Sequence, residues 1–190
     1  MFELLTGLGL AMPAGLNPYI PLLAVALADR YFGLLHLSAP YDMISSPAGI
    51  IVITILLIVE LVADKVPLVD HVNDLINSVV RPSAGAVLVM ASTGTVDSIN
   101  PIFAMALCLV VAGSVHTVKA SVRPTVTATT GGIGNPIVSA AEDGLAIGLT
   151  VVALLAPIVI VGVLIAVIAL IFTLLKRRRR RRNMVAEQQP

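Results

Sequence analysis

Long apolar stretches constrain this chain more than any other feature. From Leu145 to Leu175 the sequence has no charged residue, and a helix of about 20 apolar residues already crosses the hydrocarbon core of a bilayer. The whole chain is 57% apolar and only 12% charged, unlike the composition of a soluble globular domain. The sequence therefore predicts an integral membrane protein without a soluble domain large enough to function by itself.

The breaks between apolar stretches predict an all-α bundle of about six transmembrane helices. The stretch from Leu145 to Leu175 is too long for one crossing, and Pro157 is a natural place for it to turn. Residues 1–175 would then form one membrane domain, and residues 176–190 a basic, disordered tail. We expect the crossings at residues 3–28, 48–65, 83–98, 101–119, 138–155 and 157–175.

The positions of lysine and arginine predict the orientation, because short loops rich in these residues stay in the cytoplasm. Lys65 and Arg81 fall in the expected loop between the second and third helices, and Lys119 and Arg123 fall between the fourth and fifth. The tail from Lys176 to Arg182 is an unbroken basic run that would attract anionic lipids. We expect a bacterial cytoplasmic (inner) membrane protein with both termini in the cytoplasm and no nucleic-acid partner.

Two Asn-Pro pairs interrupt the apolar segments. Asn17-Pro18 lies deep in the first segment, and Asn135-Pro136 precedes the fifth. Asparagine caps exposed backbone amides and proline suits the first helical position, so each pair predicts a helix N-terminus at or within the membrane. Interrupted helices of this kind surround polar ligands in transporters. The alternative is a proline kink that neighbouring helices satisfy.

The densest polar stretch follows the second predicted helix. Glu60 and Asp64 stand one helical turn apart, and an acid at the bilayer centre costs about 2.5 to 3.5 kcal/mol, so we expect Glu60 to face the bundle and find a partner. If the helix bends but continues through Pro67, residues 71 and 74 return to the same face. The stretch continues with Lys65, Asp70, His71 and Asp74.

The other ends of the predicted helices supply partners for these acids. Three arrangements remain open: an ion-paired plug that holds the helix ends in register, a proton relay or divalent-cation site formed by carboxylates with a histidine, and an anion or phosphate-headgroup site formed by the bases. An internal echo, Val80–Ser83 and Val122–Thr125, hints at a repeat. The candidate partners are Lys65, Arg81, His116, Lys119, Arg123, Asn135, Glu142 and Asp143.

Common enzyme signatures do not occur in the sequence. It has no His-Glu-x-x-His motif of an intramembrane metalloprotease and no Gly-x-Ser-x-Gly nucleophile elbow. Its single cysteine, Cys108, lies in an apolar stretch, where a packing role is expected. The sequence therefore predicts neither an enzyme nor a bound cofactor.

Several short motifs, each weak alone, form a more specific combination. They are Ala14-Gly15-Leu16-Asn17-Pro18-Tyr19, Glu60 with Asp64-Lys65-x-Pro67-x-x-Asp70, Arg81-Pro82, Lys119 with Arg123, and Gly134-Asn135-Pro136 with Glu142-Asp143. Together they resemble the domain-of-unknown-function 4126 family of bacterial integral membrane proteins, over the chain up to about Pro157. The resemblance implies a multi-helix membrane protein and transfers no activity, substrate or catalytic residue.

Interrupted helices beside intramembrane acids favour a small transporter or channel-like protein, with a charged site near the cytoplasmic face. The main alternative is a structural or lipid-organising membrane protein, whose charges pair internally and which could form a homo-oligomer. A third is a membrane enzyme acting on lipid headgroups, for which the sequence offers no nucleophile or metal site.

Overall fold

The computed structural model describes an all-helical chain over residues 2–37, 39–65, 67–92 and 100–157, with residues 159, 162, 165, 166 and 169 beyond; at residues 2–4, 67–72, 74 and 101 only the backbone is described. No described residue lies in a strand, so the predicted fold class is confirmed. The helices are α1 (Phe2–Leu16), α2 (Tyr19–Leu27), α3 (Pro47–Ala63), α4 (Pro67–Ser92), α5 (Pro101–Thr130) and α6 (Asn135–Leu155), with a π-helical turn η1 (Ala28–Phe32) and a 3-10 turn η2 (Tyr41–Ser45).

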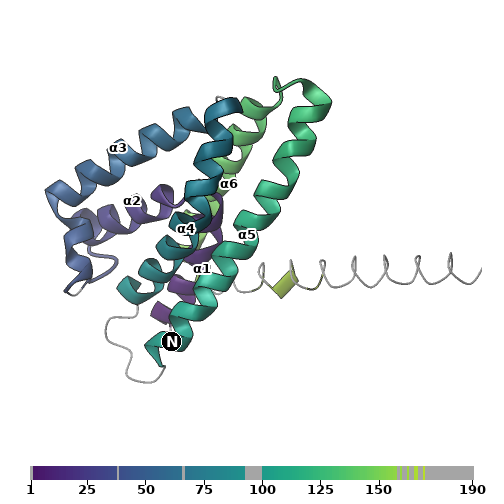
Figure 1. The fold of residues 1–190 in the computed structure, drawn as a ribbon. Helices are drawn as coiled ribbons and strands as arrows, with labels where there is room; N and C mark the ends of the chain where they lie inside the picture. The colour runs from purple at the N-terminus through teal and green to yellow at the C-terminus, as the bar shows by residue number, and fades with distance from the viewer. Residues whose placement is uncertain are drawn as a thin grey trace, which may run out of the picture.

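Helix α1 is the centre of the bundle, because it packs against α4, α5 and α6 along its length (Figure 1). Helices α2 and α3 pack against each other at one side of this group. Helix α1 begins at the end of the bundle where α4 finishes and α5 starts, and the turn from α3 into α4 lies at the other end. The break after α1 lies inside the bundle and not at its surface, because Asn17 and Pro18 are both buried.

Glycines let α1 approach its neighbours closely. A Cβ atom on Gly15 would lie 2.5 Å from the Ala112 carbonyl oxygen of α5, and one on Gly7 would lie 2.8 Å from Val89 Cα of α4. Small residues at such positions bring helix backbones together, which is how helices in a membrane gain packing energy. Cys108 is fully buried in the same region, in agreement with the packing role expected for it.

The outer surface of the bundle is apolar. Among the described residues, three helical segments are long and apolar enough to cross a membrane: Leu75–Ser92, Ile102–Thr130 and Asn135–Leu155. Helix α3 exposes Ile51, Ile55, Val59 and Val62, each more than half accessible. In water such a surface would favour aggregation, so the chain has the surface as well as the composition of a membrane protein.

Two predicted helix boundaries were wrong, because the stretches that contain the basic residues are helical and do not form loops. Helix α4 begins at residue 67 instead of 83, and α5 continues to residue 130 instead of 119. At 1.5 Å per residue, Arg81 lies about 21 Å from the start of α4 and Lys119 about 27 Å from the start of α5. Both Arg-Pro pairs are mid-helix, with Pro82 and Pro124 inside α4 and α5. Ion pairing within the bundle offsets part of the cost that made loops the expected place for these charges.

Two further expectations concern the ends of helices. The helix containing Glu60 does not bend through Pro67 but ends at Ala63, and Pro67 begins a new helix, because proline has no N–H to continue the old one. Helix α6 starts at residue 135, slightly earlier than the predicted 138. The predicted crossing at 157–175 lies mostly outside the described residues, and the tail 176–190 lies entirely outside them.

Candidate functional site: an ion-paired cluster inside the bundle

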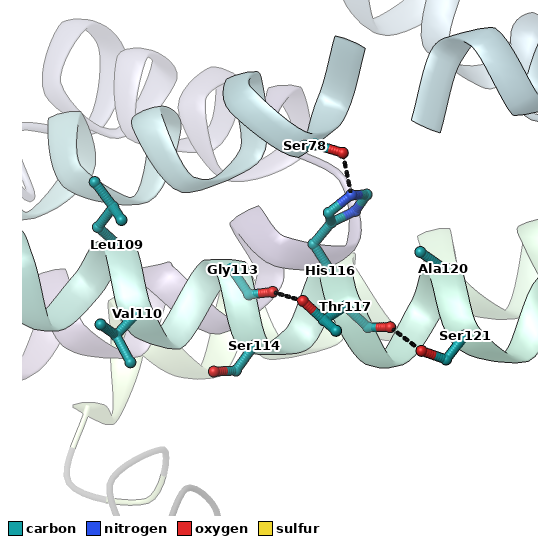
Figure 2. Close-up of a pocket in the computed structure, with 9 residues that line it drawn as sticks. All are labelled: Ser78, Leu109, Val110, Gly113, Ser114, His116, Thr117, Ala120 and Ser121. Carbon is teal, nitrogen blue, oxygen red and sulfur yellow. Dashed lines mark hydrogen bonds between the residues drawn. The ribbon is translucent and has the colours of Figure 1, made fainter. Parts of the chain in front are cut away.

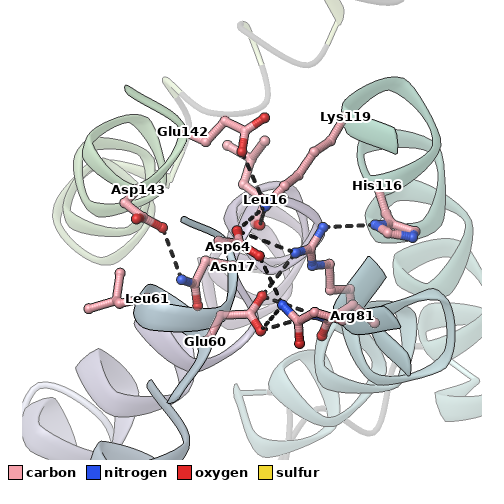
Figure 3. Close-up of polar contacts among 12 residues, drawn as sticks. Leu16, Asn17, Glu60, Leu61, Asp64, Arg81, His116, Lys119, Glu142 and Asp143 are labelled. Atoms are coloured by element: carbon pink, nitrogen blue, oxygen red, sulfur yellow. Dashed lines mark hydrogen bonds and ion pairs between the residues drawn. The ribbon is translucent and has the colours of Figure 1, made fainter. Parts of the chain in front are cut away.

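Asp64, at the C-terminal end of α3, is the centre of a buried cluster of charges (Figure 3). Its Oδ2 atom lies 2.9 Å from Lys119 Nζ and 3.0 Å from Arg123 Nη2, both on α5. Its Oδ1 atom accepts a hydrogen bond of 2.9 Å from Asn73 Nδ2 of α4. Both carboxylate oxygens are therefore occupied by N–H donors, from two different helices.

Glu60, one turn earlier on α3, pairs with Arg81 of α4. Arg81 Nη2 donates to Glu60 Oε1 at 2.9 Å, and the Arg81 side chain is fully buried. Asn77 Nδ2 lies 3.0 Å from both oxygens of Glu60, and Asn73 Nδ2 lies 2.8 Å from Oε2. The expectation that Glu60 faces the bundle and finds a partner is confirmed.

A third carboxylate, Glu142 of α6, also contacts the cations of the cluster. Its Oε2 atom lies 2.6 Å from Arg123 Nη2 and 3.2 Å from Lys119 Nζ. Among the described contacts three cations thus face three carboxylates, and this pairing offsets part of the several kcal/mol of solvation that each ion loses on burial. The cluster links α3, α4, α5 and α6, which the sequence places far apart.

The interruption between α1 and α2 lies against this cluster. Asn17 Oδ1 accepts the Tyr19 backbone N–H at 3.1 Å, and Asn17 Nδ2 donates to Asp143 Oδ1 at 3.0 Å. Lys119 Nζ donates to the Leu16 carbonyl oxygen at 3.0 Å, so a cation meets the partial negative charge at the end of α1. A helix thus starts deep in the first segment as predicted, one residue later than expected: α2 begins at Tyr19 with Pro18 at its N-cap position, and Asn17 and Pro18 are both buried.

Asn135 plays a different part from the one predicted for it. The residue that caps α6 is Gly134, and the Asn135 side chain reaches across to α5, with Nδ2 3.0 Å from Thr127 Oγ1. The turn between α5 and α6 is made by Gly131 and Gly132, whose φ angles of 61° and 89° favour glycine. Asn135 therefore ties α6 to α5 near their turn and does not cap a helix.

His116 connects the cluster to the outer face of α5. Arg81 Nη1 lies 2.8 Å from His116 Nδ1, and Ser78 Oγ lies 3.2 Å from Nε2. A guanidinium has only donors, so Nδ1 accepts, and the proton of a neutral ring is on Nε2. Figure 2 shows Ser78 and His116 beside an open groove of about 590 Å³, lined along α5 by Gly113, Thr117 and Ser121.

The remaining predicted residues lie apart from the cluster or outside the described side chains. Lys65 is exposed and donates to its own helix, at the Leu61 carbonyl oxygen. The side chains of Asp70, His71 and Asp74 are outside the described part of the structure. Among the described residues no three His, Cys, Asp or Glu side chains are grouped to hold a metal ion. The divalent-cation alternative thus has no ligand set in that part of the chain.

Sequence reasoning missed the polar residues of α4 that serve the carboxylates, namely Asn73, Asn77 and Ser78. A signal for two of them was present, because Asn73, Asn77 and Arg81 are spaced four apart and share one face of a helix. The predicted crossings leave residues 66–82 outside the membrane helices, so this spacing was not connected with the carboxylates.

Asn17 and Asp143 offer a direct test of the link between the helix break and α6. Asn17→Ala is expected to cost about 1–2 kcal/mol, since Tyr19 N–H and Asp143 both lose a partner. The double variant with Asp143→Ala should cost less than the sum of the single variants, with a coupling of about 0.5–3 kcal/mol. The measurement is unfolding in mixed detergent micelles followed by circular dichroism, and strictly additive costs would contradict the link.

Comparison with known proteins gives one match. The family model described as Domain of unknown function (DUF4126) matches residues 4–177, which is most of the chain and includes every member of the cluster. No curated protein and no solved structure matches. The motifs singled out in the sequence thus led to the right family, and the chain belongs to the DUF4126 family.

Proposed function

We propose that this protein is a small membrane transport protein, in which a polar solute passes the bundle at the ionised cluster beside the break between α1 and α2. The observation that carries this proposal is the burial of three cations and two carboxylates inside an apolar bundle, with a third carboxylate, Glu142, partly buried beside them. Ionisable groups within membrane segments are costly, and they typically mark solute pathways and proton relays.

Stability alone is a weak reason to keep such a cluster. Replacing a buried ion pair with apolar residues of similar volume is often neutral or stabilising, because the side chains no longer need to be desolvated. Glu60 and Arg81 are 3% and 0% exposed, so apolar side chains could fill their places. A cluster that packing does not require is better explained by a role in function.

The helix break provides the second element that transport needs. Discontinuous helices in transporters place backbone carbonyls and amides around a solute, where they replace water. Here the end of α1 presents the Leu16 carbonyl oxygen to Lys119, and the start of α2 is held by Asn17. A change of backbone angles at Asn17-Pro18 alone would redirect both helix ends.

Flux through reconstituted liposomes tests the proposal. We expect the wild-type protein to carry at least one of protons, sodium, potassium, phosphate or small carboxylates, and the double variant Glu60→Met with Arg81→Met to fold but carry none. Lys65→Ala is the control, because Lys65 is exposed and bonds only its own helix among the described contacts. If wild type and double variant are alike for every solute, the transport assignment is wrong.

A structural or lipid-organising role is the second candidate, and the pairing within the cluster favours it. Each of the three carboxylates has a cation within 3.0 Å, so the charges can serve as a plug that fixes helix register. In that case the same double variant would lose no flux, because none exists, and would alter only stability or assembly. We assign no catalytic step to either candidate.

We further propose that the protein lies in a bacterial cytoplasmic membrane with Lys65 and the basic tail inside. Arg81, Lys119 and Arg123 no longer support this orientation, because they are buried in the bundle. Lys65 and the run from Lys176 to Arg182 remain, and the positive-inside tendency still applies to them. The start of α1 lies at the opposite end of the bundle from the turn between α3 and α4, which contains Lys65. With Lys65 inside, we therefore propose an N-terminus on the outside, in place of the expectation that both termini are cytoplasmic.

A further inference from the structure

Glu142 differs from the other two carboxylates of the cluster. Its side chain is 14% exposed, whereas those of Glu60 and Asp64 are 3% and 2% exposed. Both of its contacts with cations use one oxygen, Oε2, which bridges Lys119 and Arg123. Glu142 is therefore the member that a molecule from outside the cluster could replace with least disturbance.

The two cations that hold Glu142 are positioned without it. Asp64 Oδ2 lies 2.9 Å from Lys119 Nζ and 3.0 Å from Arg123 Nη2, and Lys119 also donates to the Leu16 carbonyl oxygen. An ammonium and a guanidinium fixed side by side match the oxygens of a carboxylate in both charge and donor direction. Removing the Glu142 carboxylate would take one negative charge from beside this pair.

The neighbouring acid does not compete for these cations. Asp143 follows Glu142 in α6, but its Oδ1 atom accepts from Asn17 Nδ2 at 3.0 Å. Helix α6 packs mainly on α1 and meets α5 in few places. The bridge from Glu142 to Lys119 and Arg123 is thus a main polar link between α5 and α6, together with the contact of Asn135 and Thr127.

We infer that Lys119 and Arg123 form a binding site for a small soluble carboxylate, and that the Glu142 side chain occupies this site when no ligand is present. A carboxylate ligand takes the place of the Glu142 oxygen, and α6 is then released from its ionic link to α5. Because it names a class of solute, this inference rests on the transport function proposed above. Binding is tested without any measurement of flux, so the two proposals can fail separately.

The test is chemical rescue of Glu142→Ala in phosphatidylcholine nanodiscs. Sodium formate or acetate is expected to raise the thermal unfolding midpoint of this variant, while sodium chloride at equal concentration is not. At ten times its dissociation constant the anion should raise the midpoint by about 3–5 °C for a chain of this length. Asp42→Ala, which removes an exposed carboxylate outside the cluster, is the matched control and should show no such rise.

The inference would be overturned if formate and acetate did not raise the unfolding midpoint of Glu142→Ala. It would also be overturned if chloride raised this midpoint equally, or if formate or acetate raised that of Asp42→Ala equally. A rise produced by phosphatidylglycerol in the nanodisc, with none from formate, would also overturn it, because the ligand would then be a lipid phosphate. If Glu142→Ala does not fold, the same titrations on Glu142→Gln decide, with a smaller rise expected. Specific binding without flux would refute the transport proposal alone.

Discussion

Asp64→Asn is expected to cost about 3–5 kcal/mol of folding free energy, because it removes the central anion of a buried cluster and leaves Lys119 and Arg123 poorly compensated. The substitution keeps size and shape, so the loss is not one of packing. Neither orientation of the new amide fits. If the new Nδ2 takes the place of Oδ2, an NH2 group faces the two cations. If it takes the place of Oδ1, it faces the NH2 group of Asn73.

Glu142→Gln is the matched variant, since it removes the same charge from the same cluster. The described cation contacts of Glu142 use Oε2 alone, so a glutamine can keep its oxygen there and turn its amide group away. Its side chain is also partly exposed. We therefore expect a cost of about 1 kcal/mol, near the net value of a single hydrogen bond.

The measurement for both variants is the unfolding midpoint in mixed detergent micelles, followed by helical circular dichroism, with retention volume on size exclusion as a check of the folded state. The two costs should differ several-fold. Equal costs would mean that net charge matters and the arrangement of acceptors does not, which would contradict the contacts described for Asp64.

Gly15→Val is expected to destabilise the bundle by more than about 3 kcal/mol, above the usual range for overpacking. A Cβ atom there would lie 2.5 Å from the Ala112 carbonyl oxygen and 2.6 Å from Val115 Cβ, so α1 and α5 would have to separate. The first of these atoms belongs to the backbone and cannot be moved by a change of rotamer. Separation would also carry the end of α1 away from Lys119.

Gly144→Val is the control for this prediction. Gly144 also lies within a helix, but a Cβ atom added to it meets nothing within 4 Å. Valine is a somewhat better helix former than glycine, so a neutral or slightly stabilising effect is expected. The same unfolding assay serves both variants. A similar loss for the two substitutions would show that the contact between α1 and α5 is not the cause of the loss at Gly15.

The positions of the charges limit how a solute could reach them. Arg81 and Lys119 are both more than one helical turn from either end of their helices, so the cluster lies within the bundle and not at its face. The groove beside His116 approaches it from the α5 side, and partly exposed Glu142 approaches it from the α6 side.

The sequence alone determined that this is an all-helical membrane protein, because hydropathy over about 20 residues is a local property. It also determined the break at Asn17-Pro18, since capping and the missing proline N–H act within a few residues. The need of Glu60 for a partner followed in the same way from the cost of an unpaired acid in the membrane.

Only the tertiary structure decided where the basic residues lie and which acid each one meets. Arg81 and Lys119 looked like loop residues because the cost of burying a cation is assessed locally, while the carboxylates that offset it come from other helices. Asn135 was expected to cap a helix and instead bonds Thr127, for the same reason. Pairing between helices depends on distances in space, and no local pattern in the sequence contains them.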